Sequence, residues 1–187
     1  GRVDTFTLGK GFFVKRKELD LLINWEVYER FNEIFIDVNR FLTLSKFIKE
    51  VEEIIPFEIK DLEIFRIIYY FLKYWEKSDE VLGNIFVIKI LQKLGYLSPI
   101  LLKCQKCGKD LLGEECIYID ISSNKAFCIE CRKIGFYLTK TKAILDYNSI
   151  LNTEFEDLIE KRGNKLLKDL AIWEVWSKIK SRIEQEV

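Results

Sequence analysis

Apolar side chains alternate over residues 1–23, where Phe6 and Leu8, and then Phe12 and Val14, are two positions apart. Alternation at period two is the pattern of a β-strand, because successive side chains of a strand point to opposite faces. The sequence therefore predicts short strands at the start of the chain, before the pattern changes.

From residue 24 to residue 97 the apolar positions change to the three-to-four-residue spacing of helices with one buried face. Polar caps and helix-breaking residues mark the expected ends. These signals predict a helix from Asn24, a second along residues 41–55 that Pro56 ends, a third capped by Asp61, and a fourth that begins at Ser78 or Asp79 and ends at Gly95.

Residues 138–187 return to helical spacing. Thr139 is the expected cap of the first helix here, and Thr153-x-x-Glu156 has the pattern of a capping box. Gly163 is the expected end of the helix that begins at this capping box, and Asn164 is the expected cap of the last helix.

Two Cys-x-x-Cys pairs lie between these helical zones and are separated by 20 residues. The segment between them alternates from Cys116 to Ile121 and then has the turn-forming residues 122–125, which predicts a β-hairpin. Two cysteine knuckles joined by a hairpin form a zinc ribbon, which we place at about residues 100–137.

Thiolates at this spacing are the ligands of a tetrahedral structural zinc, with metal–sulfur distances of about 2.3 Å. We therefore predict Zn²⁺ held by Cys104, Cys107, Cys128 and Cys131, and favour it over disulfides or a redox dithiol. Because four ligands leave no position for water or substrate, the site is expected to be structural. The fifth cysteine, Cys116, is expected to be a small buried residue of the strand.

The composition narrows the functional classes. Apolar residues make up 49% of the chain and charged residues 32%, which is typical of a globular protein. Lys+Arg and Asp+Glu both number 30, so the bulk charge does not predict a nucleic-acid binder, although basic residues outnumber acidic ones over 101–142 and 161–187.

Other patterns are missing from the sequence. No apolar run reaches the length of a membrane span and no signal-peptide pattern begins the chain, so we expect a cytoplasmic protein with no membrane partner. There is no histidine and no Gly-rich phosphate loop. We therefore expect a protein that is not an enzyme and has no small-molecule substrate; a zinc-dependent enzyme is disfavoured by the closed site.

The junction of the fourth predicted helix and the first knuckle has a recognisable motif. It runs Phe86-x-x-Lys89-x-Leu91-x-x-Leu94-Gly95-Tyr96-x-x-Pro99 and continues Leu102-x-Cys104-x-x-Cys107-Gly108. This motif resembles the bacterial recombination mediator family RecO, and residues 26–31 resemble the family's passage from its barrel to its helices.

The resemblance implies a role in DNA repair and DNA recombination without catalysis. RecO proteins bind single- and double-stranded DNA, anneal complementary strands, and act with a RecR-like protein and with the acidic-apolar tail of the single-stranded-DNA-binding protein. They begin with an oligonucleotide-binding (OB) barrel of five strands. Because only about 25 residues precede the helices here, we expect the first strands to be missing from this chain or lost in its lineage.

Two sets of cations are candidate contacts. Lys15, Arg16 and Lys17 form a basic turn suited to phosphates, beside aromatic residues at 12–13 that we expect to pack on the helices; the alternative is a merely solubilising turn. Lys89 and Lys93 are candidates for binding the acidic partner tail, with a solvated helix face as the alternative.

If this turn does not contact DNA, the alternative candidate is the basic C-terminal helix, which carries Lys178, Lys180 and Arg182.

The expected fold is mostly α, with a helical domain at 24–187 that contains an inserted four-cysteine zinc ribbon, and a short β segment at 1–23 that resembles the end of an OB barrel. The predicted function is a RecO-like repair mediator. The alternative is a protein-interaction adaptor that keeps the structural zinc ribbon but no longer binds DNA.

Overall fold

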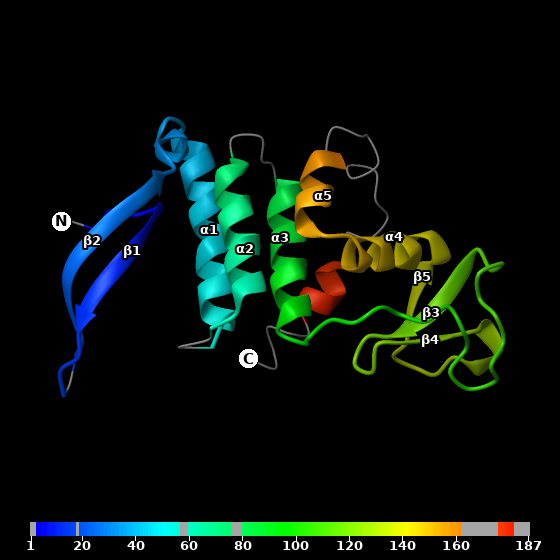
Figure 1. Ribbon diagram of the computed structural model, residues 1–187. Coiled ribbons are helices and arrows are strands. Elements are labelled where there is room, and N and C mark those ends of the chain that lie inside the picture. Colours follow the sequence, from blue (N-terminus) through cyan, green and yellow to red (C-terminus); the bar gives the residue numbers. More distant parts are fainter. Residues whose placement is uncertain (1–2, 18, 57–59, 76–79, 162–175, 182–187) are drawn as a thin grey trace.

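Two small sheets lie at opposite ends of a layer of helices (Figure 1). The computed structural model describes residues 3–17, 19–56, 60–75, 80–161 and 176–181. The chain runs from a two-stranded hairpin through the helices to a three-stranded sheet beside the cysteines, and then returns to the helices. The mostly helical fold with a cysteine-bearing β insertion is confirmed. Among the described residues, no helix combines the length and apolarity needed to cross a bilayer.

The N-terminal hairpin pairs β1 (Thr7–Val14) with β2 (Leu21–Arg30) in antiparallel fashion. Its strands confirm the alternating pattern, but the helix predicted from Asn24 is wrong, because residues 24–30 belong to β2. The aromatic side chains of this segment have helical spacing and also suit a strand, and pairing with β1 decides between the two. The boundary predicted after residue 23 thus falls inside β2, and the division into two domains stays a prediction.

The aromatic residues of the hairpin do not pack on the helices as expected. Phe12 is 38% exposed and Phe13 is 60% exposed. The hairpin instead meets the helices at its other end, where the Phe6 ring contacts Phe35 and Phe41 and Tyr69 donates a hydrogen bond to Glu29.

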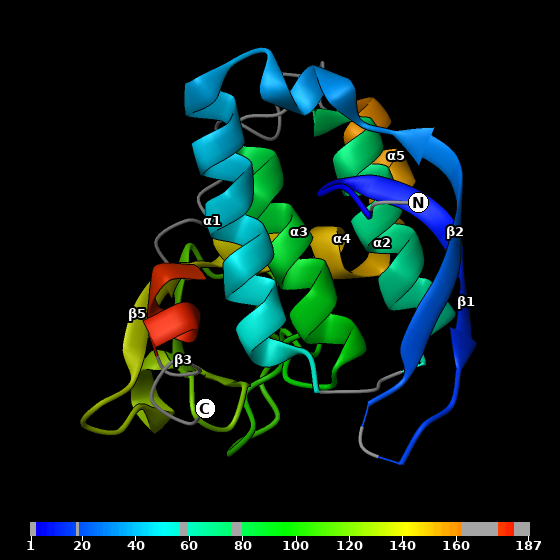
Figure 2. The same ribbon diagram turned by 90° about the vertical axis from the view of Figure 1, so that its left-hand side faces the viewer.

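Three long helices form the centre of the molecule. A short 3-10 turn, Asn32–Phe35, leads into α1 (Val38–Ile54), which is followed by α2 (Leu62–Lys73) and α3 (Glu80–Lys93). Asp61 caps α2 as predicted, since its carboxylate accepts the N–H groups of Glu63 and Ile64. α1 and α2 both pack on α3, which is buried along nearly its whole length (Figure 2).

The end of α3 is the glycine turn that the sequence predicts. Gly95 has φ +85, and the N–H of Tyr96 donates to the carbonyl of Leu91 at 2.9 Å. The predicted start at Ser78 or Asp79 lies outside the described residues.

Two further helices, α4 (Thr141–Asn152) and α5 (Phe155–Lys161), cover the other side of α3. Both predicted caps here are wrong. Thr139 lies in a strand, and the Thr153 hydroxyl donates to the carbonyl of Ser149 at the end of α4 instead of capping α5. Residues 176–181 are helical, while Gly163 and Asn164 lie outside the described residues.

The second sheet holds β3 (Cys116–Asp120) between β4 (Lys125–Phe127) and β5 (Tyr137–Lys140), all antiparallel. The β3–β4 hairpin was predicted, whereas β5 was not. One face of the sheet is buried through Ile117, Ile119 and Ala126. Since β5 runs directly into α4, the sheet is attached to the helical layer.

Candidate metal centre

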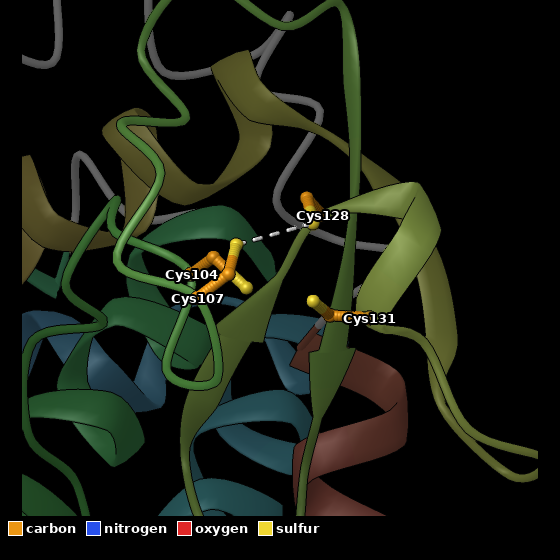
Figure 3. A group of neighbouring side chains, drawn as sticks. All are labelled: Cys104, Cys107, Cys128 and Cys131. Carbon is orange, nitrogen blue, oxygen red and sulfur yellow. Dashed lines mark hydrogen bonds between the residues drawn. The ribbon is translucent and has the colours of Figure 1, made fainter.

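The four knuckle cysteines converge on one point of the structure. Their Sγ atoms all lie within 4.8 Å of one another (Figure 3). Cys104 and Cys107 come from the loop before β3, Cys128 follows β4, and Cys131 ends the short 3-10 turn Ile129–Cys131. The sequence-predicted ligand set is therefore brought together from two segments.

Backbone hydrogen bonds shape the first knuckle. The N–H of Gly108 donates to the carbonyl of Cys104 at 2.9 Å, and the N–H of Cys104 donates to the carbonyl of Lys109 at 2.8 Å. Gly108 has φ +78, a left-handed conformation that a residue with a side chain rarely adopts. The loop can therefore turn tightly enough to bring Cys104 and Cys107 to the same side.

A tight turn also shapes the second knuckle, where the N–H of Cys131 donates to the carbonyl of Cys128 at 3.1 Å. The two knuckles are joined directly, since the N–H of Gln105 donates to the carbonyl of Ala126 at 3.0 Å. This bond holds the first loop against the end of β4, so that the two pairs of sulfurs face each other.

The spacing of the sulfurs fits a tetrahedral metal. Four sulfurs at about 2.3 Å from a central Zn²⁺ are about 3.8 Å apart along each edge of the tetrahedron. The Cys107 and Cys128 sulfurs are 3.7 Å apart. Cys104 and Cys128 are buried, Cys131 is half-buried and Cys107 is exposed, so an ion would enter from the side of Cys107.

The thiols have different proton affinities in this arrangement. Burial raises the pKa of Cys104, but N–H groups of Cys107, Cys128 and Lys106 outweigh it and lower the pKa to about 6. Burial, together with its contact with the Glu130 carboxylate, raises the pKa of Cys128 to about 12. One thiolate is thus favoured at neutral pH, and a divalent cation would displace the remaining protons.

Cys116 does not belong to this cluster, and the expectation that it is buried is wrong. It lies on β3 opposite Lys140 and is exposed. Because Ile117 and Ile119 take the buried face of the strand, alternation turns Cys116 outward.

Neither prediction for Lys89 holds, because this lysine is buried and is only 4% exposed. Its Nζ donates to the carbonyl of Leu151 at 2.8 Å and to Gln92 Oε1 at 3.0 Å. Burial lowers the pKa of Lys89 to about 8. The spacing of apolar residues in α3 does not reveal that α4 and α5 also pack on this helix. The Lys89 side chain therefore ends at the C-terminus of α4 and does not line the rim of a groove.

The other predicted contact residues lie at the surface. Lys93 keeps an exposed side chain with its Nζ 3.6 Å from Glu63 Oε2. Lys15, Arg16 and Lys17 are exposed in the loop between β1 and β2, at the opposite end of the molecule from the cysteine cluster (Figure 1).

The C-terminal helix, the alternative candidate for DNA contact, has fewer unpaired cations among its described residues than its sequence suggests. Lys180 is paired with Glu50 of α1 at 2.7 Å. Lys178 is exposed, and Arg182 lies outside the described residues.

A pairing on the outer face of the second sheet was not predicted from the sequence. The Arg132 guanidinium donates to the Tyr118 hydroxyl at 3.1 Å and lies 5.3 Å from the centre of its ring. The available signal was the alternation of β3, which places Tyr118 opposite to the buried Ile117 and Ile119.

Part of this chain is similar in sequence to a known protein. The chain is 27% identical over 164 residues to the DNA repair protein RecO of Caldicellulosiruptor saccharolyticus, a match that covers 84% of this chain and 66% of that protein. The chain is thus a distant homologue of RecO and spans about two thirds of that relative's length. No family model and no solved structure matches the chain.

Proposed function

We propose that Cys104, Cys107, Cys128 and Cys131 bind one Zn²⁺ with a structural role. The proposal is supported by the convergence of four sulfurs at tetrahedral spacing and by a thiol-only ligand set, which suits zinc. The ion would neutralise the crowded thiolates and fix the two knuckles on each other. A reducing compartment such as the cytoplasm would keep these thiols available.

Elemental analysis of freshly purified, reduced protein tests this assignment. We expect one zinc per chain, strongly reduced occupancy in Cys107→Ser, and unchanged occupancy in Cys116→Ser, the matched control whose thiol lies outside the cluster. Wild-type protein without zinc would contradict the proposal, and a halved content in Cys116→Ser would overturn the ligand assignment.

We further propose that the chain is a RecO-like mediator of recombinational DNA repair that binds DNA and repair proteins without catalysis. The observation that carries this proposal is the homology to a DNA repair protein over 84% of the chain. We propose single- and double-stranded DNA as ligands, and a RecR-like protein and the acidic-apolar tail of the single-stranded-DNA-binding protein as partners.

The basic loop between β1 and β2 is the first candidate for contact with DNA. Lys15, Arg16 and Lys17 are all exposed there, and exposed Phe13 on the adjoining strand is available for stacking on bases. Cations on an exposed loop, together with an accessible ring, suit a flexible single strand.

A salt titration of single-stranded DNA binding tests the proposed function. Binding through Lys and Arg releases counterions, so the affinity should fall as salt rises, and each lost phosphate contact should flatten the log–log slope by about 0.7. Replacing residues 15–17 together by Glu should flatten the slope, whereas replacing the exposed Lys46, Lys49 and Lys60 by Glu should not. Absence of any binding by the wild-type protein at low salt would refute the DNA-binding role.

Lys93 is the remaining candidate for the acidic partner tail, because Lys89 is buried. An acidic-apolar peptide labelled for fluorescence anisotropy should bind the wild-type protein and Lys93→Arg more tightly than Lys93→Glu. Equal affinities for all three proteins would place the peptide elsewhere.

The observation that supports the alternative function, an adaptor without DNA binding, is the apolar surface of the hairpin. Leu19 is 81% exposed, and Ile23 and Tyr28 are each 59% exposed. Such side chains suit contact with protein, whether a partner or further strands. The same salt titration discriminates the two functions, since an adaptor would show no binding at any salt concentration.

A further inference from the structure

The outward face of the three-stranded sheet combines aromatic, apolar and basic side chains. Residues directly opposite each other in an antiparallel pair point to the same face. Tyr118 lies opposite Phe127 on one side and Leu138 on the other, so these three side chains form a row across the sheet. Leu138 is 51% exposed and Tyr118 is half-buried, whereas Phe127 is 9% exposed, so the accessible part of the row is Tyr118 and Leu138.

Cations surround this row. Lys140 lies opposite Cys116 at one end of β3, and Lys125 lies opposite Asp120 at the other. Both lysines are exposed. Arg132 reaches the row from the second knuckle, where it donates to the Tyr118 hydroxyl at 3.1 Å.

The acidic group on this face is engaged within the sheet. The two carboxylate oxygens of Asp120 accept the hydroxyl groups of Ser122 and Ser123, each at 2.6 Å. Three exposed cations therefore surround Tyr118, while the carboxylate of Asp120 is bound within the turn between β3 and β4.

We propose that this face, centred on Tyr118 and surrounded by Lys125, Arg132 and Lys140, binds a single strand of nucleic acid. Because the Arg132 guanidinium lies over the Tyr118 ring, a base stacks on this pair and on Leu138, and Lys125 and Lys140 contact the phosphates on either side. The charge complementarity selects a polyanion, and the tyrosine selects one with unpaired bases, because a duplex keeps its base faces stacked. The inference rests on the proposed DNA-binding function and adds a second DNA-binding surface to the loop of residues 15–17.

The position of the face separates it from the first candidate site. The sheet and the β1–β2 hairpin lie at opposite ends of the helical layer (Figure 1). Arg132 directly follows Cys131, so the second knuckle determines where its guanidinium lies. Substitutions on this face therefore leave the hairpin loop unchanged, and the two surfaces are open to separate tests.

Neutralising variants test the electrostatic part. Lys125→Gln with Lys140→Gln should remove two phosphate contacts and flatten the salt slope for a single-stranded oligonucleotide by about 1.4. At about 50 mM monovalent salt this corresponds to an affinity about 60-fold weaker. The matched control, Lys49→Gln with Lys60→Gln, removes two exposed charges elsewhere and should change neither quantity.

Tyrosine variants test the stacking part. Loss of one base–aromatic stack in Tyr118→Ala should weaken binding by about 5-fold to 140-fold. Tyr118→Phe keeps the ring and should bind nearly as well as wild type. Unchanged helical circular dichroism and zinc content in each variant would verify that the fold is retained.

Photocrosslinking locates the contact directly. An oligonucleotide carrying 5-iodouracil should crosslink to the peptide that contains Tyr118 in zinc-loaded wild-type protein. Crosslinks confined to residues 7–30, with unchanged affinity in the ribbon variants, would overturn this inference and leave the proposed DNA-binding function intact. Absence of binding by the wild-type protein at low salt would overturn both.

Discussion

Replacing Lys89 by Met removes a buried positive charge from the contact between α3 and α4. The ammonium group lies among apolar core residues, and its nearest partners are the carbonyl of Leu151 and the side chain of Gln92. The same carbonyl also accepts from Gln92 Nε2 at 2.9 Å. The substitution therefore leaves Leu151 with one donor, and the side chain of Met is close to Lys in length.

The magnitude follows from the difference in pKa between the folded and unfolded states. Burial lowers the pKa of Lys89 from an ordinary value of 10.5 to about 8. Between these values the unfolded chain binds more protons than the folded protein, so the free energy of unfolding rises with pH. From pH 7 to pH 10 this contribution of Lys89 amounts to about 2–3 kcal/mol, and it is lost again as the pH falls through about 8.

Urea unfolding of the zinc-loaded wild type and variant, followed by circular dichroism, measures this difference. Between pH 7 and pH 10 the stability of wild type should rise by about 2–3 kcal/mol relative to that of Lys89→Met. At an m value of about 2 kcal/mol/M this is a shift of about 1 M in the urea midpoint. Lys49→Met, which alters an exposed lysine that does not act on Lys89, should differ from wild type by an amount independent of pH. A pH-independent difference for Lys89→Met as well would refute the burial of the charged group.

Two further predictions concern the core and the metal. Gly83→Ala should destabilise the protein by about 1–3 kcal/mol, because a Cβ there would lie 2.1 Å from Cε2 of the buried Phe47; urea midpoints should show this loss, whereas Gly113→Ala, with no atom within 4 Å, should match wild type. Chelation should leave most helical circular dichroism and make residues 100–137 sensitive to protease, because the helices also bury apolar side chains against one another, as Phe71 does against Phe86; complete loss of helix on chelation would contradict this.

Local signals in the sequence were sufficient for the cysteine cluster and for several helix ends. The two Cys-x-x-Cys spacings identify four side chains that the structure brings within 4.8 Å. Asp61 and Gly95 mark helix ends through hydrogen bonds between residues close together in the sequence. Interactions of this range are encoded in a short window, which is why they were predictable.

Two of the errors arise from contacts between residues far apart in the sequence, which a short pattern does not reveal. Residues 24–30 are strand because β1 pairs with them, and Lys89 is buried because α4 ends against it. The capping box at Thr153 fails for a local reason, since its hydroxyl donates backward to the carbonyl of Ser149. In each case the short-range pattern allowed two structures, and a particular neighbour selects one.

A role in DNA repair is tested most directly by strand annealing. Zinc-loaded protein is mixed with two complementary oligonucleotides that carry a donor and an acceptor dye, and the rate of duplex formation is measured against protein concentration and salt. Wild type should anneal the strands faster than they pair spontaneously, and the acceleration should decline as salt rises, because phosphate contacts weaken. Annealing at the spontaneous rate at every protein concentration would contradict the proposed mediator function.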